Sequence, residues 1–377
     1  MLIRLGFKGQ IFCTEPTREL VQLILEVSAK VQEYDVKDKK RDEVLYNLDD
    51  VERTISFFQL LKTGQKVTFP GFEVELFEAG HILGATSIVF SKDYERVCFS
   101  GDLGRANDLI HSVPKFPSDI DYLILESTYG DREHEEIDTL EYLAREIILV
   151  KESGGVLLIP SFAVARTQVI IKYLYDLFED NPSLKIPMYV DSPMGLKATN
   201  IYKKNIESLK VDETDFLSAL KSVKFFEFGK DKQKFLKAKG PLIMIASSGM
   251  ISGGKVLQYF DMYAKHEKNT ILMIGYQGEG TIGSKLVEGE REIKLFGHTI
   301  NVRARVELLP SMSAHADRVE MKEMLMCGKK RLKRIFLNHG EAKAKKEFKL
   351  YLETEIGCDV IIPENGTTYE LEEKSHE

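Results

Sequence analysis

The sequence predicts a mixed α/β protein with more than one folding unit, and three observations support this prediction. The chain has 377 residues, more than one ordinary domain, so two folding units are expected. Hydrophobic residues make up 43% and charged residues 29%, which is typical of a globular protein rather than a disordered or fibrous one. Short β-branched and aromatic runs alternate with longer stretches of helical spacing, as they do in α/β architectures.

The expected strands are short apolar runs bounded by turn residues. Residues 72–77 alternate polar and apolar side chains, and residues 156–159 form a continuous apolar run that predicts a buried strand. Helical spacing of Ile, Leu and Val predicts helices over 135–151 and 167–177. Further strands are expected at residues 86–90, 96–100, 121–125, 188–190, 242–246, 270–274, 293–296, 302–308, 334–337 and 360–362.

Residues 196–239 differ from this pattern. They are helical in spacing, rich in Lys, Asp and Glu, and contain no run that resembles a strand. We therefore expect this stretch to form a lid or a peripheral part of a second domain.

Charge and hydropathy narrow the classes of partner. The net charge of −7 means that the overall field repels polyanions, so any contact with RNA must come from a local basic groove or a bound metal. The longest apolar runs are about one strand long, far short of the ~20 residues of a spanning helix. No membrane contact is expected, and the cytoplasm is the expected location.

Five ionisable residues each follow an expected strand or lie in a short segment of small residues. Strand ends meet at one edge of a sheet, where metal sites and clefts form. Taken singly, His81 also fits a satisfied loop histidine and Asp102 a turn residue. The five are His81 in EAGHILGA, Asp102 in FSGDLG, Glu126 in LESTYG, His315 in SMSAHAD and His339 in LNHGE.

In order and character these motifs resemble those of the β-CASP family of metallo-β-lactamase-fold ribonucleases, which includes the pre-mRNA 3′-end processing endonuclease and its bacterial and archaeal relatives. Four further motifs between them, PSFAVARTQ, DSPMG, ASSGM and GYQGEGT, look like landmarks of the inserted β-CASP domain. The resemblance implies an αββα metallo-β-lactamase sandwich, incomplete at its N-terminus, with a β-CASP α/β domain inserted. The implied boundaries are residues 1–130 and 312–377 for the metallo-β-lactamase domain and 131–311 for the β-CASP domain.

The resemblance also implies roles for individual residues. His81 would bind one zinc ion, His339 a second, and Asp102 would bridge the two. Glu126 would orient His315, which would act as a general acid towards the leaving oxygen.

RNA phosphates are expected to contact residues of the β-CASP domain, because guanidinium forks and backbone N–H groups suit phosphate geometry. Arg166 equally fits a structural ion pair. The remaining histidines, His111, His134, His266, His298 and His376, are expected to be ordinary surface or loop residues. The expected RNA contacts are Ser161, Arg166, Ser247, Ser248 and Gly249.

One departure from the family pattern concerns the metal loop. Family members carry H-x-H-x-D-H before the stretch matched here by LGFKGQIFCT, whereas none of the eight histidines lies within two positions of another. Without that loop each zinc keeps only two protein ligands, counting Asp102 for both, so zinc should bind weakly. A start placed too late is the favoured interpretation, and a fragment or a degenerate copy are the alternatives.

The expected function is zinc-dependent hydrolysis of RNA by an endoribonuclease, with 5′→3′ exonuclease activity left open. The first alternative is a catalytically inactive RNA-binding scaffold, because the metal loop is missing. The second is a metallo-hydrolase of small molecules, against which the long insertion between the domain halves counts. RNA is the expected partner, and a homodimer is one assembly that stays open.

Overall fold

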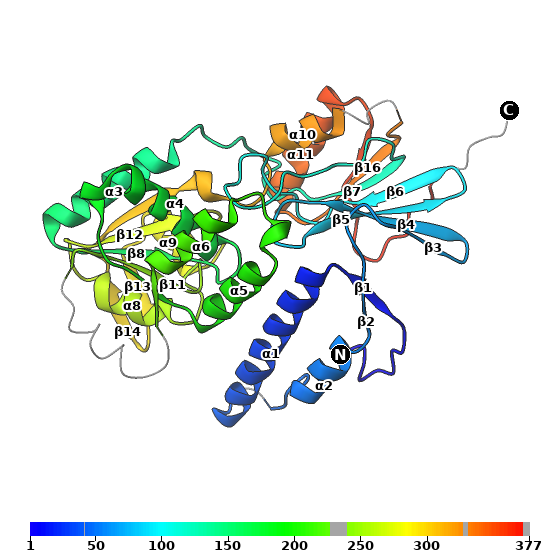
Figure 1. The fold of residues 1–377 in the computed structure, drawn as a ribbon. Coiled ribbons are helices and arrows are strands. Elements are labelled where there is room, and N and C mark those ends of the chain that lie inside the picture. The colour runs from blue at the N-terminus through cyan, green and yellow to red at the C-terminus, as the bar shows by residue number, and fades with distance from the viewer. Residues whose placement is uncertain (41, 227–239, 327–330, 372–377) are drawn as a thin grey trace.

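Two lobes, each built on one β-sheet, make up most of the computed structural model (Figure 1). The structure describes residues 1–40, 42–226, 240–326 and 331–371. One lobe contains a seven-stranded mixed sheet, and its strands come from both ends of the chain. The other contains a six-stranded parallel sheet built from the middle of the chain.

The seven-stranded sheet has the order β17-β16-β7-β6-β5-β4-β3. The strands β3, β4, β5 and β6 pair antiparallel, and β6, β7, β16 and β17 pair parallel. Their bounds are β3 (Lys66–Phe69), β4 (Phe72–Glu78), β5 (Thr86–Lys92), β6 (Glu95–Phe99), β7 (Tyr122–Leu125), β16 (Arg334–Leu337) and β17 (Asp359–Ile361).

One face of this sheet packs against α10 (Arg318–Met326) and α11 (Ala342–Glu355) around a core that includes Leu123, Ile335 and Phe348. The other face carries a row of neighbouring phenylalanine rings that remain more than a third exposed. These rings are Phe72, Phe90 and Phe99, with successive ring centroids 6.0 and 5.8 Å apart.

The six-stranded sheet is the centre of a three-layer lobe. Its strands are apolar along their whole length because alternate side chains face two different helical layers. In β8, Leu157 and Ile159 belong to one core, whereas Val156 and Leu158 belong to the other. The order is β10-β9-β11-β8-β12-β15, with β8 (Val156–Pro160), β9 (Met188–Asp191), β10 (Lys224–Phe225), β11 (Leu242–Ala246), β12 (Thr270–Ile274) and β15 (Arg305–Leu309).

Helices α3, α4, α5 and α6 supply the first of these cores, and α8, α9 and the β13–β14 hairpin supply the second. Helix α3 begins after Asp138, whose carboxylate accepts hydrogen bonds from the N–H groups of Leu140 and Glu141. The bounds are α3 (Thr139–Ser153), α4 (Arg166–Asp180), α5 (Pro193–Lys204), α6 (Glu213–Ser222), α8 (Val256–Tyr263), α9 (Ile282–Val287), β13 (Glu292–Leu295) and β14 (His298–Asn301).

The N-terminal segment lies against both lobes through its long helix α1 (Glu15–Lys37). The hydroxyls of Thr14 and Thr17 at the start of α1 both donate to the carbonyl of Gly84, each at 2.9 Å. Gly84 has a φ of +81°, and a Cβ there would lie 2.8 Å from the Thr14 hydroxyl oxygen, so the close contact requires glycine. The segment also contains β1 (Ile11–Cys13), α2 (Leu48–Ile55) and β2 (Phe58–Leu60).

The predicted α/β class is confirmed, and residues 334–337 form a strand with the predicted bounds. Helix α3 begins at residue 139 rather than 135, because the cap is Asp138. The prediction that residues 196–239 are peripheral is wrong for the described part, since Tyr202 and Phe216 are fully buried. Residues 227–239 lie outside the described residues, as does His376. Among the described residues no helix is long and apolar enough to span a bilayer.

Candidate active site

The candidate site lies at the edge of the seven-stranded sheet where four strands end. Strands β4, β6, β7 and β16 run in one direction, so their last residues meet at the same edge. His81, Asp102, Glu126 and His339 each follow one of these strands within three residues. His315 reaches the same place from the other lobe, after β15 and the 3-10 turn at Pro310–Met312.

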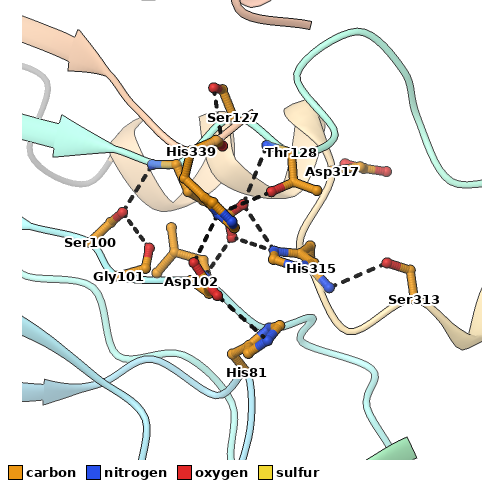
Figure 2. Close-up of polar contacts among 12 residues, drawn as sticks. His81, Ser100, Gly101, Asp102, Ser127, Thr128, Ser313, His315, Asp317 and His339 are labelled. Atoms are coloured by element: carbon orange, nitrogen blue, oxygen red, sulfur yellow. Dashed lines mark hydrogen bonds and ion pairs between the residues drawn. The ribbon is translucent and has the colours of Figure 1, made fainter. Parts of the chain in front are cut away.

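Asp102 lies between two imidazole rings (Figure 2). Its Oδ1 is 3.0 Å from Nδ1 of His339, and its Oδ2 is 3.8 Å from Nε2 of His81. The carboxylate thus presents one oxygen to each histidine. This arrangement suits a carboxylate that bridges two cations, each also bound by one imidazole.

His81 has the protonation state that a metal ligand needs. Burial, together with the charge of His315, holds the pKa of His81 well below its usual range, so the ring is neutral and keeps a lone pair. Its Nδ1 is buried without a hydrogen-bond partner among the described side chains and backbone. The nitrogen that faces Asp102 is Nε2, so a metal ion held between the two residues would bind Nε2 and leave Nδ1 on the protein side of the ring.

His315 and Glu126 form a hydrogen-bonded pair beside Asp102. The Nδ1 of His315 lies 3.0 Å from both carboxylate oxygens of Glu126. Glu126 is buried and accepts a 2.6 Å hydrogen bond from the N–H of Leu103, which fixes its orientation. Burial by itself lowers the pKa of His315, but the hydrogen bond and charge of Glu126 outweigh it and raise the pKa above its usual value.

Small residues allow the site loops to approach one another. Gly104 forms an isolated β-bridge with His315, and Gly80 forms one with Leu103. A Cβ at Gly104 would lie 2.0 Å from the carbonyl oxygen of Gly80, so no side chain fits there. This packing brings the loops that carry His81, Asp102 and His315 together.

His134 is a part of the site that the sequence prediction missed, since it was expected to be an ordinary loop residue. Its Nε2 donates to the carbonyl of His315 at 2.9 Å, and its ring packs at 4.8 Å between centroids on Tyr129. Burial lowers the pKa of His134, so the neutral ring with Nε2–H is the form that makes this bond. Its own N–H donates to Asp317 at 2.7 Å. His134 therefore holds the backbone of the segment that carries His315.

Arg166 lies inside the contact between the lobes, where its predicted role as an RNA contact does not fit. Its Nη2 is 3.0 Å from Oδ2 of Asp108 and its Nη1 donates to the carbonyl of Met312 at 2.9 Å. Both side chains are more than 90% buried. This geometry corresponds to the alternative interpretation, a structural ion pair, and it speaks against a direct phosphate contact.

The ion pair continues into a buried chain of hydrogen bonds that ends near His81. His111 Nδ1 lies 2.9 Å from Oδ1 of Asp108, and His111 Nε2 lies 2.9 Å from the Tyr202 hydroxyl. The same hydroxyl accepts from the N–H of Leu83 at 3.4 Å. Burial by itself raises the pKa of Asp108, but His111 and Arg166 outweigh it and hold this pKa well below its usual range. His111 is thus a buried structural residue, not the surface residue that was expected.

The remaining predicted RNA contacts differ in how far they are buried. Ser161 is fully buried and its hydroxyl accepts from Thr167, so it is placed away from any phosphate. Ser247 and Ser248 are half-buried at the end of β11, and their hydroxyls contact those of Ser192 and Ser252. Their role in RNA binding stays a prediction. Gly249 is buried beside Phe162.

The donor set suits a pair of divalent cations. Ligand atoms of His81, Asp102 and His315 lie within 4.8 Å of one another, as do those of Glu126, His315 and His339. His81 and His339 each add one imidazole to an oxygen of Asp102, and imidazole with carboxylate is a common ligand set for zinc. Since catalytic zinc usually has three protein ligands, each metal would take further ligands beyond these.

Two family models match the chain. Residues 167–286 match the Beta-Casp domain, and residues 299–363 match a Zn-dependent metallo-hydrolase RNA specificity domain. The first match lies in the six-stranded lobe, and the second covers the return to the seven-stranded sheet, including His315 and His339.

Several characterised proteins are similar along almost the whole chain. A ribonuclease of Thermus thermophilus is 27% identical over 90% of this chain and 77% of its own length. The transcription termination factor FttA of Methanosarcina mazei is 28% identical over 91% of this chain and 56% of its own. Integrator complex subunit 11 of Gallus gallus is 30% identical over 96% of this chain and 60% of its own. The chain thus spans less than two thirds of the latter two relatives. The two family models match both lobes, and the relatives are similar along almost the whole chain. The chain therefore belongs to the β-CASP family of metallo-β-lactamase-fold proteins.

Proposed function

We propose that this chain carries out metal-dependent hydrolysis of RNA phosphodiester bonds, as an endoribonuclease for which 5′→3′ exonuclease action is a second mode. The observation that carries the proposal is the placement of Asp102 between His81 and His339, directly beside the Glu126–His315 pair. A bridging carboxylate and a proton donor are the two parts that hydrolysis of a phosphodiester needs from a protein. The ribonuclease of Thermus thermophilus among the relatives supports RNA as the substrate.

Two zinc ions are the cofactors that we propose. When bound, they would lower the pKa of a water molecule and polarise the scissile phosphate, so that displacement proceeds at neutral pH. His81 and His339 would each hold one ion, and Asp102 would hold both. The neutral state of His81 favours this role, because a protonated imidazole cannot bind a cation.

His315 would supply the proton that the leaving oxygen needs. Its Nδ1 faces Glu126, which leaves Nε2–H as the proton that the ring can transfer. Glu126 stabilises the imidazolium before transfer and orients the ring. The Glu126 carboxylate contacts Nδ1 of His315 and the N–H of Leu103, so it would act as a positioning residue.

The experiment that tests this function measures zinc content and cleavage together. The purified chain, supplied with excess zinc, should bind zinc and cleave a labelled single-stranded RNA, and a chelator should abolish cleavage. The variant Asp102→Asn should lose zinc and lower the cleavage rate by more than ~10²-fold, because several kcal/mol of metal stabilisation disappears. His266→Ala, an exposed histidine outside the site, is the matched control and should match the wild-type protein.

Three outcomes decide between the functions considered. Zinc-dependent cleavage lost in Asp102→Asn supports the ribonuclease. RNA binding with neither zinc binding nor cleavage would indicate the inactive scaffold instead. Cleavage of small phosphodiesters without cleavage of RNA would indicate the small-molecule hydrolase.

His134 provides a separate prediction about the same site. Replacing His134 with alanine should lower kcat for RNA cleavage by roughly five- to ten-fold with KM unchanged, because a hydrogen bond of ~1 kcal/mol to the backbone of His315 is lost. Steady-state kinetics on the labelled RNA measure both constants. A rise in KM alone would contradict the positioning role.

A further inference from the structure

We propose that an apolar cavity beside His81 and His315 binds one nucleobase of single-stranded RNA, stacked on the ring of Phe162. The proposal rests on the proposed ribonuclease function and adds to it a base subsite next to the scissile phosphate. Its ligand is the flat face of a base rather than a phosphate.

The first argument is that the cavity lies next to the candidate active site. The cavity has a volume of about 360 Å³, and both His81 and His315 line it. Phe162 and Met250 reach it from the loops after β8 and β11, and Met194 reaches it from the first turn of α5. A phosphate held by metal ions on His81 and Asp102 would therefore place a neighbouring nucleotide at the mouth of this cavity.

The chemistry of the walls is the second argument. Most of the wall is carbon, from the side chains of Phe162, Met194, Met250 and Ile82. Arg166 also lines the cavity, but its guanidinium is already paired with Asp108, so the mostly apolar wall suits the face of a base better than a phosphate. Proteins that bind single-stranded RNA commonly stack unpaired bases on aromatic side chains.

The third argument is that Phe162 is held as a rigid platform. Its carbonyl accepts from the N–H of Thr167 at 3.1 Å and from the Thr167 hydroxyl at 2.7 Å. The backbone of Gly249 lies against the ring, so closely that a Cβ there would come within 2.8 Å of Cδ2. The residue nevertheless remains 40% exposed. A ring fixed in advance loses little conformational entropy when a base stacks on it.

The same contacts explain two residues that were expected to bind phosphate. The Thr167 hydroxyl, which donates to the carbonyl of Phe162, also lies 3.1 Å from the hydroxyl of Ser161, so Ser161 supports this contact from inside the lobe. Gly249 is the residue that lets the ring lie against the backbone. Both residues thus contribute to RNA binding through Phe162 rather than by direct contact.

The test compares equilibrium binding of two labelled oligomers to the full chain, measured by fluorescence anisotropy with chelator present so that no cleavage occurs. The first is a short oligoadenylate, and the second is the same oligomer with abasic sites in place of the bases. Phe162→Leu keeps an apolar side chain but removes the ring, and Phe162→Tyr keeps the ring. Phe90→Leu is the matched control, because Phe90 is 38% exposed on the distant sheet face.

Phe162→Leu should weaken the binding of oligoadenylate roughly ten-fold, because one base stack is lost. Phe162→Tyr and Phe90→Leu should bind it as the wild-type protein does, and the abasic oligomer should bind all four proteins alike. Equal binding of oligoadenylate by Phe162→Leu and the wild-type protein would overturn the base subsite while leaving the ribonuclease proposal intact. A wild-type chain that binds neither oligomer in chelator, and that also fails to bind or cleave RNA when supplied with zinc, would overturn both.

Discussion

Replacing Glu126 with glutamine is expected to shift the alkaline limb of the kcat–pH profile for RNA cleavage to lower pH. The hydrogen bond and charge of Glu126 raise the pKa of His315 against the effect of burial. Without that charge the pKa falls, so the protonated, active form of His315 is lost at a lower pH. The rate deficit should therefore grow as pH rises and shrink towards acid pH, where His315 is protonated in both proteins.

His315→Ala sets the upper limit of this effect. Loss of the general acid should lower kcat by roughly 10²–10⁴-fold and remove the alkaline limb that His315 causes. Glu133→Gln is a matched control, because Glu133 lies near the same segment but pairs with Arg318 at the surface. Cleavage rates of labelled RNA under saturating substrate, measured across the pH range, give the profiles. An unshifted profile for Glu126→Gln would show that this carboxylate does not set the pKa of the proton donor.

Replacing Arg166 with methionine is expected to lower the free energy of unfolding by ~3–5 kcal/mol. The substitution leaves the carboxylate of Asp108 buried between the lobes without its guanidinium, and an uncompensated buried charge costs about this much. The carbonyl of Met312 also loses its donor. Urea denaturation followed by circular dichroism measures the change.

Arg303→Met is the control, because it shows how much the free energy of unfolding changes when an exposed arginine is replaced by methionine. Arg303 pairs with Glu267 at the surface, and the two side chains are 63% and 71% exposed, so the cost should stay within ~1 kcal/mol. The double variant Asp108→Asn with Arg166→Met should cost less than the sum of the single changes, because the two residues share one interaction. If Arg166→Met instead raised KM for RNA without loss of stability, a phosphate contact would be the better interpretation.

The sequence by itself determined the fold class and the position of the candidate site. Continuous apolar runs such as residues 156–160 identify strands because a parallel strand buries both faces. His81, Asp102, Glu126 and His339 were recognisable from local pattern, because each follows an expected strand. That their four strands run in one direction was decided by the tertiary structure. The long helix α1 was not predicted, although Leu20, Ile24 and Val27 have helical spacing; only five of its residues are buried.

Only the tertiary structure decided what individual polar residues contact. The sequence left Arg166 between an ion pair and an RNA contact, and its partner Asp108 lies 58 positions away. His134 donates to a carbonyl 181 positions away, and Phe162 rests against Gly249 from another strand end. Local patterns report which side chains are apolar and where strands end, because burial and backbone geometry follow residue type. The partner of a charged or aromatic side chain depends on how the lobes pack, and that information is absent from any short stretch of sequence.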